Sequence, residues 1–258
     1  MPETSVYLDR LRLDGRRAFI TGGGRGIGLA TGMALAEAGA QVILSDRDPA
    51  ILSDGLAAMA AAGHTADGAH LDVTDPGAVT AAAEAAAGTD ILIANAGIAW
   101  PDTPAEDLPD AAWTRVIDVD LNGVFWCARA FGRAMLARRS GAIVAVGSMS
   151  GIISNTPQRQ AHYNAAKAGV HHLVRSLAGE WAPRGVRVNA VAPTYVATEM
   201  SLPAFRETDM GSTWLAMTPM GRIAEPAEIA AVIAFLASDA ASAMTGAVVP
   251  VDCGYTIW

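Results

Sequence analysis

The sequence predicts an α/β fold with one domain and a doubly wound, parallel sheet of about seven strands. Short apolar runs alternate along the chain with alanine-rich segments of helical period, an order typical of β-α-β units. Most of the apolar runs are nearly continuous, as expected for strands covered on both faces. No linker rich in Pro or Ser divides the 258 residues, so we expect residues 1–258 to form a single domain.

Seven segments are predicted as strands, the weakest being the one at 66–71. They are Arg17–Ile20, Gln41–Leu44, Ala66–Leu71, Asp90–Ala94, Ala142–Val146, Val186–Val191 and Ala247–Val251. The helices predicted between them are Ile27–Ala38, Pro49–Ala62, Pro76–Ala87, Ala111–Arg138, Tyr163–Ala182 and Pro226–Ser238. Right-handed crossovers between parallel strands make a doubly wound sheet the simplest topology.

Composition excludes several classes of protein. A hydrophobic content of 52% excludes a disordered chain, and charged residues interrupt every apolar run too early for a membrane span. The net charge of -8 and the lack of Lys/Arg runs argue against a nucleic-acid partner. The two cysteines and five histidines lack the spacing of a disulfide framework or a zinc site, so no metal ligand is predicted. Residues 1–17 lack a secretory signal, which predicts a cytoplasmic location.

A glycine-rich turn follows the first predicted strand and opens the first predicted helix. Its sequence is Thr-Gly-Gly-Gly-Arg-Gly-Ile-Gly from Thr21 to Gly28, and glycines there let a pyrophosphate approach the backbone N–H groups and the helix dipole. Asp46 ends the second strand, where a carboxylate accepts hydrogen bonds from adenosine ribose hydroxyls and repels a 2′-phosphate. Arg25 and Arg47 argue for that phosphate, but Asp46 favours NAD as cofactor.

Five motifs in order give the chain a resemblance to the short-chain dehydrogenase/reductase family, and together they span nearly its whole length. These are T-G-x-x-x-G-x-G at 21–28, Asn95-Ala96-Gly97, Ser148, Tyr163-x-x-x-Lys167 and Pro193-Thr-Tyr-Val-Ala-Thr198. The resemblance implies a Rossmann-type fold and hydride transfer between a nicotinamide and an alcohol or ketone. Thr194 departs from the glycine usual after this proline. The cofactor-binding residues predicted in this way are Gly22, Arg25, Gly26, Ile27, Gly28, Asp46, Asp72, Val73, Asn95, Gly97, Tyr163, Lys167, Pro193, Val196 and Thr198.

Tyr163, Lys167 and Ser148 are the predicted catalytic residues. Tyrosine is a poor base at its ordinary pKa of about 10, and an ammonium close by favours the phenolate. Tyr163 and Lys167 lie at positions i and i+4 of a predicted helix, hence on one face. Ser148 follows a predicted strand, where its hydroxyl can stabilise charge on the substrate oxygen. No Gly-x-Ser-x-Gly elbow is present, which excludes a serine hydrolase of that type.

The fourth catalytic position departs from the family. The resemblance implies an asparagine three residues ahead of Gly123, where it helps to hold a proton-relay water to the lysine, but this chain has Asp120. If the relay uses mainly the backbone carbonyl, Asp120 serves with little loss. If it needs the side-chain amide, activity falls or the pH profile shifts. Asn122 cannot replace it, because residues i and i+2 point to different faces of a helix.

The substrate is predicted from the resemblance to the polyol dehydrogenases of the family, which implies oxidation of a secondary hydroxyl in a sugar alcohol or vicinal diol. The alternatives are an NADPH-dependent carbonyl or 3-oxoacyl reductase and, in another class, a dinucleotide-binding sensor or scaffold without turnover. The resemblance also implies a substrate lid near 200–220 and a homotetramer with the apolar end, Gly246–Trp258, at a subunit contact. The predicted substrate contacts are Ser148, Ser150, Asn155, Tyr163 and Trp214, with Gln158 a further polar group able to face a hydroxylated substrate.

Overall fold

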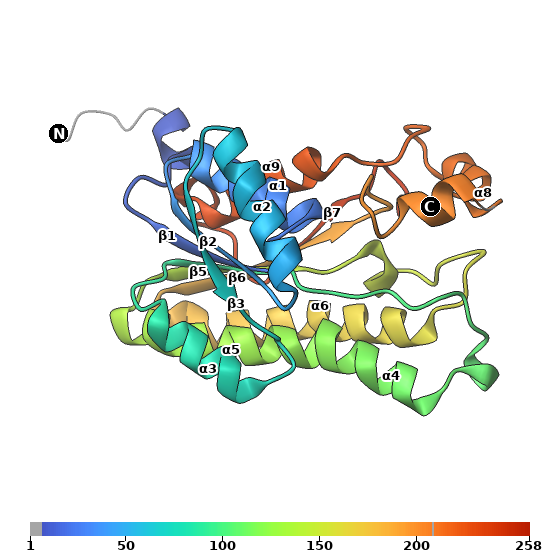
Figure 1. The fold of residues 1–258 in the computed structure, drawn as a ribbon, viewed down its shortest axis with the longest axis horizontal. Helices are drawn as coiled ribbons and strands as arrows, with labels where there is room; N and C mark the ends of the chain where they lie inside the picture. Colours follow the sequence, from blue (N-terminus) through green and yellow to red (C-terminus); the bar gives the residue numbers. More distant parts are fainter. Residues whose placement is uncertain (1–6, 208) are drawn as a thin grey trace.

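The computed structural model describes residues 7–207 and 209–258, so the first six residues and position 208 of the expected lid lie outside the described part of the chain. One sheet of seven parallel strands runs through it in the order β3-β2-β1-β4-β5-β6-β7 (Figure 1). The strands are β1 (Arg17–Thr21), β2 (Gln41–Asp46), β3 (Ala66–His70), β4 (Ile91–Ala94), β5 (Gly141–Val146), β6 (Val186–Pro193) and β7 (Val248–Val251). This order confirms the predicted doubly wound, single Rossmann-type domain.

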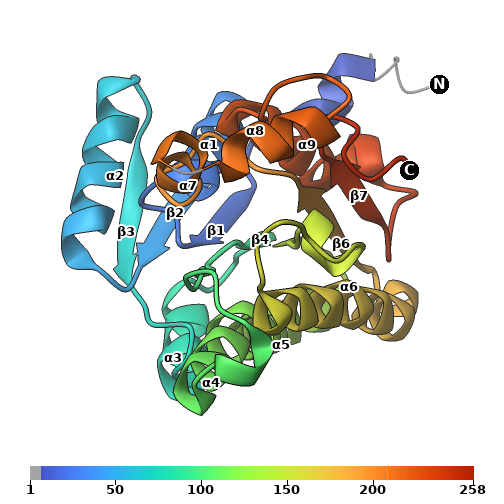
Figure 2. The ribbon, with the colours of Figure 1, turned by 90° about the vertical axis from the view of Figure 1, so that its right-hand side faces the viewer.

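Helices cover both faces of the sheet (Figures 1 and 2). On one face lie α1 (Gly26–Glu37), α2 (Pro49–Ala61) and α9 (Pro226–Ala237), and on the other lie α3 (Pro76–Ala85), α4 (Asp110–Ile117), α5 (Gly123–Arg138) and α6 (Ala161–Trp181). Two short helices, α7 (Leu202–Glu207) and α8 (Met210–Met217), follow β6. The remaining helical turns are η1 (Tyr7–Leu11), η2 (Ala105–Asp107), η3 (Asp118–Asn122), η4 (Met149–Gly151), η5 (Ala182–Arg184) and η6 (Asp239–Ala241).

Several helices begin where the sequence supplies a capping side chain followed by proline. Asp48 accepts a hydrogen bond from the backbone N–H of Ala50 at 2.8 Å, and Pro49 then opens α2. Asp75 and Pro76 do the same for α3. A capping carboxylate satisfies donors that the helix itself leaves free, and proline fits the first turn because it has no N–H to lose. These local signals are the reason that the predicted starts at 49 and 76 are correct.

Two apolar clusters form the core, one on each face of the sheet. Phe19 and Phe131 belong to the first, with ring centroids 4.6 Å apart, and Ile20 and Leu44 belong to the second. Central strands such as β4 are buried along their whole length, whereas β3 at the edge is largely exposed. The continuous apolar runs therefore have the physical cause expected of them, and the weak pattern of 66–71 reflects its edge position.

One expectation about the helices is wrong. The segment predicted as a single helix over 111–138 consists of α4 and α5 with the π-helical turn η3, Asp118–Asn122, between them. A π turn widens the backbone locally and often lies at functional sites. Here it contains Asp120, and the side-chain amide of Asn122 donates to Asp118 at 2.9 Å instead of pointing toward the cleft.

Candidate active site

A cleft of about 870 Å³ lies at the C-terminal ends of the strands, beneath α7 and α8. Ligands of open α/β sheets bind at this edge. All of the predicted site residues line the cleft except Gly28 and Asn155, which lie behind its wall. The structure therefore brings together side chains from segments as distant as the β1–α1 turn and α8.

The glycine turn fits a dinucleotide because its backbone is packed too closely for side chains. A Cβ on Gly28 would lie 2.2 Å from the carbonyl oxygen of Gly22, and Gly22 itself has a φ of +60°. The side-chain amide of Asn95 donates to the carbonyl oxygens of Thr21 at 2.9 Å and Gly22 at 2.8 Å. Both amide protons of Asn95 thus hold the turn, a structural role that accompanies its position on the cleft.

The acidic residues predicted near the adenosine also line the cleft. Asp46 ends β2, where its Oδ1 accepts the backbone N–H of Asp48 at 3.1 Å. Asp72 accepts both the backbone N–H and the hydroxyl of Thr74, at 2.9 and 2.7 Å. Burial acts to raise the pKa of Asp72, but these hydrogen bonds outweigh it and leave the pKa below its usual range. A carboxylate oxygen at each position can accept hydrogen bonds from hydroxyl groups.

Arg25 forms an ion pair with Glu199. Its Nη1 lies 2.6 Å from Oε2 of Glu199, which follows β6 on the opposite wall of the cleft. Both side chains are exposed. The predicted cofactor residue Thr198 adjoins this pair, and a Cβ on Gly26 would touch its methyl group at 3.4 Å.

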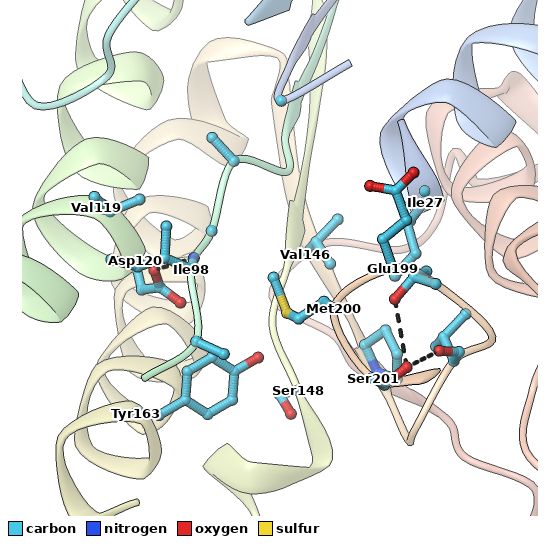
Figure 3. A pocket seen from close by; sticks show the side chains of 18 of the residues that line it. Ile27, Ile98, Val119, Asp120, Val146, Ser148, Tyr163, Glu199, Met200 and Ser201 are labelled. Atoms are coloured by element: carbon cyan, nitrogen blue, oxygen red, sulfur yellow. Dashed lines mark hydrogen bonds between the residues drawn. The ribbon is translucent and has the colours of Figure 1, made fainter. Parts of the chain in front are cut away.

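Tyr163 points into the cleft from α6, opposite Ser148 (Figure 3), and Lys167 of the same helix also lines the cleft. Lys167 Nζ lies 5.4 Å from the centre of the Tyr163 ring and donates to the carbonyl oxygen of Val146 at 3.1 Å. The buried Ser148 hydroxyl donates to Ser150 Oγ at 3.0 Å. A phenol, an ammonium and a hydroxyl thus converge where a substrate oxygen can meet them.

Asp120 forms a buried ion pair with Lys167. Its Oδ2 lies 3.4 Å from Lys167 Nζ, and its Oδ1 accepts the backbone N–H of Ile98 at 2.8 Å. Both residues are almost fully buried. A Cβ on Gly97 would lie 3.4 Å from Asp120 Oδ2 and 3.5 Å from Lys167 Nζ, so a glycine there leaves room for the pair. The residue that departs from the family is therefore in direct contact with the lysine.

This ion pair changes the electrostatics of the tyrosine. Burial raises the pKa of Tyr163, Lys167 lowers it and Asp120 raises it again, and the net direction is upward. The expected pull of the ammonium is present, but burial and the carboxylate outweigh it. Burial lowers the pKa of Lys167, whereas Asp120 and Tyr163 raise it, with a net increase that keeps the ammonium charged. Burial also raises the pKa of Asp120, against the pull of Lys167.

The sequence did not indicate a functional role for two residues of the site, His171 and Tyr195. His171 is buried under the loop that bears Ser148, and the backbone N–H of Ser148 makes a long hydrogen bond of 3.5 Å to its Nε2. Tyr195 stacks on Trp214 with ring centroids 3.8 Å apart. Tyr195 lies inside the motif at 193–198, which was the available signal. Nothing in the sequence connects His171 to Ser148.

Further features of the described residues concern membrane-spanning helices, metal ligands and the thiol of Cys127. No helix in residues 7–207 or 209–258 is long and apolar enough to cross a membrane. Within the same ranges, no group of three or more His, Cys, Asp or Glu side chains is arranged to hold a metal ion. Cys127 is buried and has its pKa raised by burial to about 12, which makes it an unreactive thiol.

The fold and the arrangement of the cleft define a nicotinamide-dinucleotide oxidoreductase, and comparison with known proteins agrees. A family model described as "Enoyl-(Acyl carrier protein) reductase" matches residues 22–256. Galactitol 2-dehydrogenase of Rhizobium johnstonii is 52% identical over 256 residues, which cover 98% of this chain and 99% of that protein. The chain belongs to the short-chain dehydrogenase/reductase family, and it is an oxidoreductase of alcohols.

Further relatives confirm the resemblance to polyol dehydrogenases. The L-tagatose-forming galactitol 2-dehydrogenase of Cereibacter sphaeroides is also 52% identical, over 98% of this chain and 99% of that protein. The crystal structure of gox2181 superposes with a TM-score of 0.96 at 49% identity, covering 98% of this chain and 100% of the other. A structure described as a gluconate 5-dehydrogenase from Beutenbergia cavernae, with a TM-score of 0.89 and 38% identity over 95% and 98% of the two chains, has NADP bound.

Proposed function

We propose that this protein is an NAD-dependent oxidoreductase that interconverts a secondary alcohol, in a polyol or vicinal diol, with its ketone. The observation that supports this best is the convergence of Tyr163, Lys167 and Ser148 on one part of the cleft. A bound nicotinamide supplies the acceptor for the hydride. Tyr163 acts as the acid/base, taking the proton of the substrate hydroxyl as its phenolate and returning it in reduction.

The neighbours of Tyr163 have distinct proposed roles. The hydroxyl of Ser148 donates to the substrate oxygen and stabilises the negative charge that develops there. The ammonium of Lys167 favours the phenolate and is available to the nicotinamide ribose. Asp120 holds that ammonium and tunes the proton relay. Gly22, Gly26 and Gly28 give the pyrophosphate access to the backbone at the start of α1.

Preference for NAD over NADP is proposed from the charges at the adenosine end. Asp46 would repel a 2′-phosphate, and the ion pair with Glu199 neutralises Arg25, the basic residue of the glycine turn. Arg47 lines the same part of the cleft and is the residue that would favour NADP.

The substrate class is proposed from the relatives and from the polar wall opposite the glycine turn. Galactitol 2-dehydrogenases are among the relatives with about half of the residues identical. Ser150 and Gln160 line the cleft, and Asn155 supports them from behind. We propose that residues 200–220, including Trp214, form the substrate lid. Hydroxyls along a polyol could make further hydrogen bonds to these side chains, which an apolar alcohol could not.

The test is the absorbance of reduced cofactor when NAD or NADP is offered with polyols, diols and simple secondary alcohols. We expect NADH formation with polyhydroxy substrates. Oxidation of NADPH by ketones or oxoacyl thioesters, with no reaction of polyols, would replace the proposal by a reductase. Cofactor binding without turnover over the whole panel would favour a dinucleotide sensor.

A variant sharpens the cofactor test. Asp46→Ala removes the charge that opposes a 2′-phosphate, so we expect the ratio of kcat/KM for NAD to that for NADP to fall about tenfold or more. Asp67→Ala is the matched control, because Asp67 is an exposed carboxylate on β3 that does not line the cleft. An unchanged ratio in Asp46→Ala would contradict the role of Asp46.

We also propose that the chain forms a homotetramer with its C-terminal end at a subunit contact. Ile257 and Trp258 are 68% and 79% exposed in the single chain, an unusual exposure for such large apolar side chains. Light scattering that gives the mass of a monomer would contradict this. The cytoplasmic location stays a prediction, which fractionation of the cells that make the protein would test.

A further inference from the structure

A chain of side-chain hydrogen bonds starts at the proposed catalytic serine and leads away from the reacting centre. Ser148 Oγ donates to Ser150 Oγ at 3.0 Å. The side-chain amide of Gln160 then donates to Ser150 Oγ at 3.2 Å and to Asn155 Oδ1 at 3.0 Å. Ser148, Ser150 and Asn155 are buried, and Gln160 is half-buried.

The series of hydrogen bonds continues through Asn155 to the helix α8. Asn155 Nδ2 donates to the hydroxyl of Tyr195 at 3.3 Å, and Gln158 Nε2 donates to the same hydroxyl at 2.7 Å. The indole Nε1 of Trp214 donates to Gln158 Oε1 at 3.0 Å. Every link from Ser148 to Trp214 is thus a hydrogen bond between side chains, and together the links connect the segment after β5, the loop before α6, the segment after β6 and α8.

Gln158 connects α8 to the rest of this series of hydrogen bonds. Both ends of its amide are used by the protein, one by Tyr195 and the other by Trp214, and the side chain is almost buried. Gln158 lines the cleft, where it was expected as a polar group able to face a hydroxylated substrate, but its amide nitrogen and oxygen are each bonded within the protein. Its amide instead fixes the distance and the orientation between two aromatic side chains.

The aromatic side chains reinforce the connection. The rings of Tyr195 and Trp214 are stacked at 3.8 Å with an angle of 11° between their planes. Tyr255 meets Tyr195 edge-on at 5.6 Å, and its hydroxyl contacts the sulfur of Met217 at 3.3 Å. Trp214 is 4% exposed although it lies on a two-turn surface helix. Stacked aromatic rings add stability beyond the area they bury.

We propose that Gln158 is a positioning residue that fastens α8 over the cleft and, through Tyr195, Asn155 and Gln160, holds Ser148 in the orientation that the reaction requires. This inference rests on the proposed function, because it takes Ser148 as the donor to the substrate oxygen and residues 200–220 as the lid. A displaced lid would release the hydrogen-bonded side chains between Trp214 and Ser148 and so misplace the Ser148 hydroxyl. Small misplacements of a reacting group reduce turnover strongly.

The experiment compares Trp214→Phe and Gln158→Leu with the parent enzyme. Trp214→Phe keeps an aromatic ring on Tyr195 but removes the N–H donor together with part of the indole, whereas Gln158→Leu removes both hydrogen bonds of the amide. We expect kcat for the preferred polyol to fall about fivefold in Trp214→Phe and further in Gln158→Leu. The affinity for NADH should stay unchanged, because neither residue contacts the glycine turn.

A second measurement reports on the lid without turnover. The backbone amide hydrogens of 202–217 should exchange faster than in the parent, and the increase should be similar in Trp214→Phe and Gln158→Leu. The reason is that exchange follows the free energy of local opening. The double variant should open no faster than Gln158→Leu alone, since both changes cut the same link. Trp113→Phe is the matched control, because Trp113 is 43% exposed on α4, away from the cleft, and it should change neither measurement.

The outcomes separate this inference from the proposed function. Parental exchange and parental kcat in both variants would overturn it. A rise in KM for the polyol with parental kcat and exchange would also overturn it, because Gln158 would then bind substrate directly. If the parent turns over no polyol, the proposed function fails, and the exchange measurement alone decides whether Gln158 fastens α8. Trp214→Phe keeps the test valid if Gln158→Leu does not fold.

Discussion

Replacing Asp120 by Asn is expected to move the pH dependence of alcohol oxidation to lower pH. Lys167 Nζ lies 5.4 Å from the centre of the Tyr163 ring. At an effective dielectric constant of about 20, a charge pair at this separation is worth about 3 kcal/mol, or roughly two pKa units in favour of the phenolate. The Asp120 carboxylate, 3.4 Å from the same ammonium, opposes this effect on the pKa of Tyr163.

The sign follows from the protonation state that oxidation needs. The phenolate is the base, so the acid limb of the rate profile follows the pKa of Tyr163. Removing the carboxylate lowers the pKa of Tyr163. We take the size of this effect as half of the interaction between Lys167 and Tyr163, so the acid limb should shift by about one pH unit. The substituted side chain keeps a carbonyl oxygen that can accept the N–H of Ile98, so the local fold should be retained.

The assay is the initial rate of NADH formation with saturating polyol, measured as a function of pH. Asp118→Asn is the matched control, because it removes a carboxylate of the same π turn that bonds to Asn122 instead of Lys167. Its acid limb should coincide with that of the parent. An unchanged or upward-shifted limb in Asp120→Asn would refute the electrostatic reasoning and favour a relay that uses only the backbone carbonyl at this position.

Two further predictions concern the cofactor turn and acid stability. Gly28→Ala places a Cβ 2.2 Å from the Gly22 carbonyl oxygen, so the turn must shift. We therefore expect the Kd for NADH, measured by fluorescence titration, to rise about tenfold or more. Gly179→Ala is the control, because its Cβ meets nothing within 4 Å and should leave the Kd unchanged; equal Kd values for the two variants would contradict this prediction. Burial lowers the pKa of His171 to about 4, with help from the charges of Arg175 and Lys167. The unfolded chain therefore takes up this proton first as the pH falls below about 6.5, and the free energy of unfolding should decrease by at most about 3 kcal/mol toward pH 4. Urea unfolding of the parent and His171→Gln at neutral and acid pH measures this loss, which the variant should lack; an identical pH dependence in the two proteins would show that His171 is not its source.

The fold was predictable because its signals are local. The continuous apolar runs of β4 and β5 follow from burial on both faces, and Asp48-Pro49 and Asp75-Pro76 mark helix starts through their own capping chemistry. The π turn at Asp118–Asn122 was not predicted, because the general helical period of 111–138 was assigned to one continuous helix. It took the packed structure to show where that helix is widened.

The residue types of the proposed site and their order can be read from the amino-acid sequence: the glycine turn, Asp46, Ser148 and the Tyr163/Lys167 pair. Spacing places each of these at the C-terminal edge of a parallel sheet, because strand ends of such a sheet meet there. The pairing of their neighbours depends instead on the three-dimensional packing. Asp120 with Lys167 and Trp214 with Gln158 are contacts between distant segments, and the long-range packing that buries them determines which partner each polar group finds.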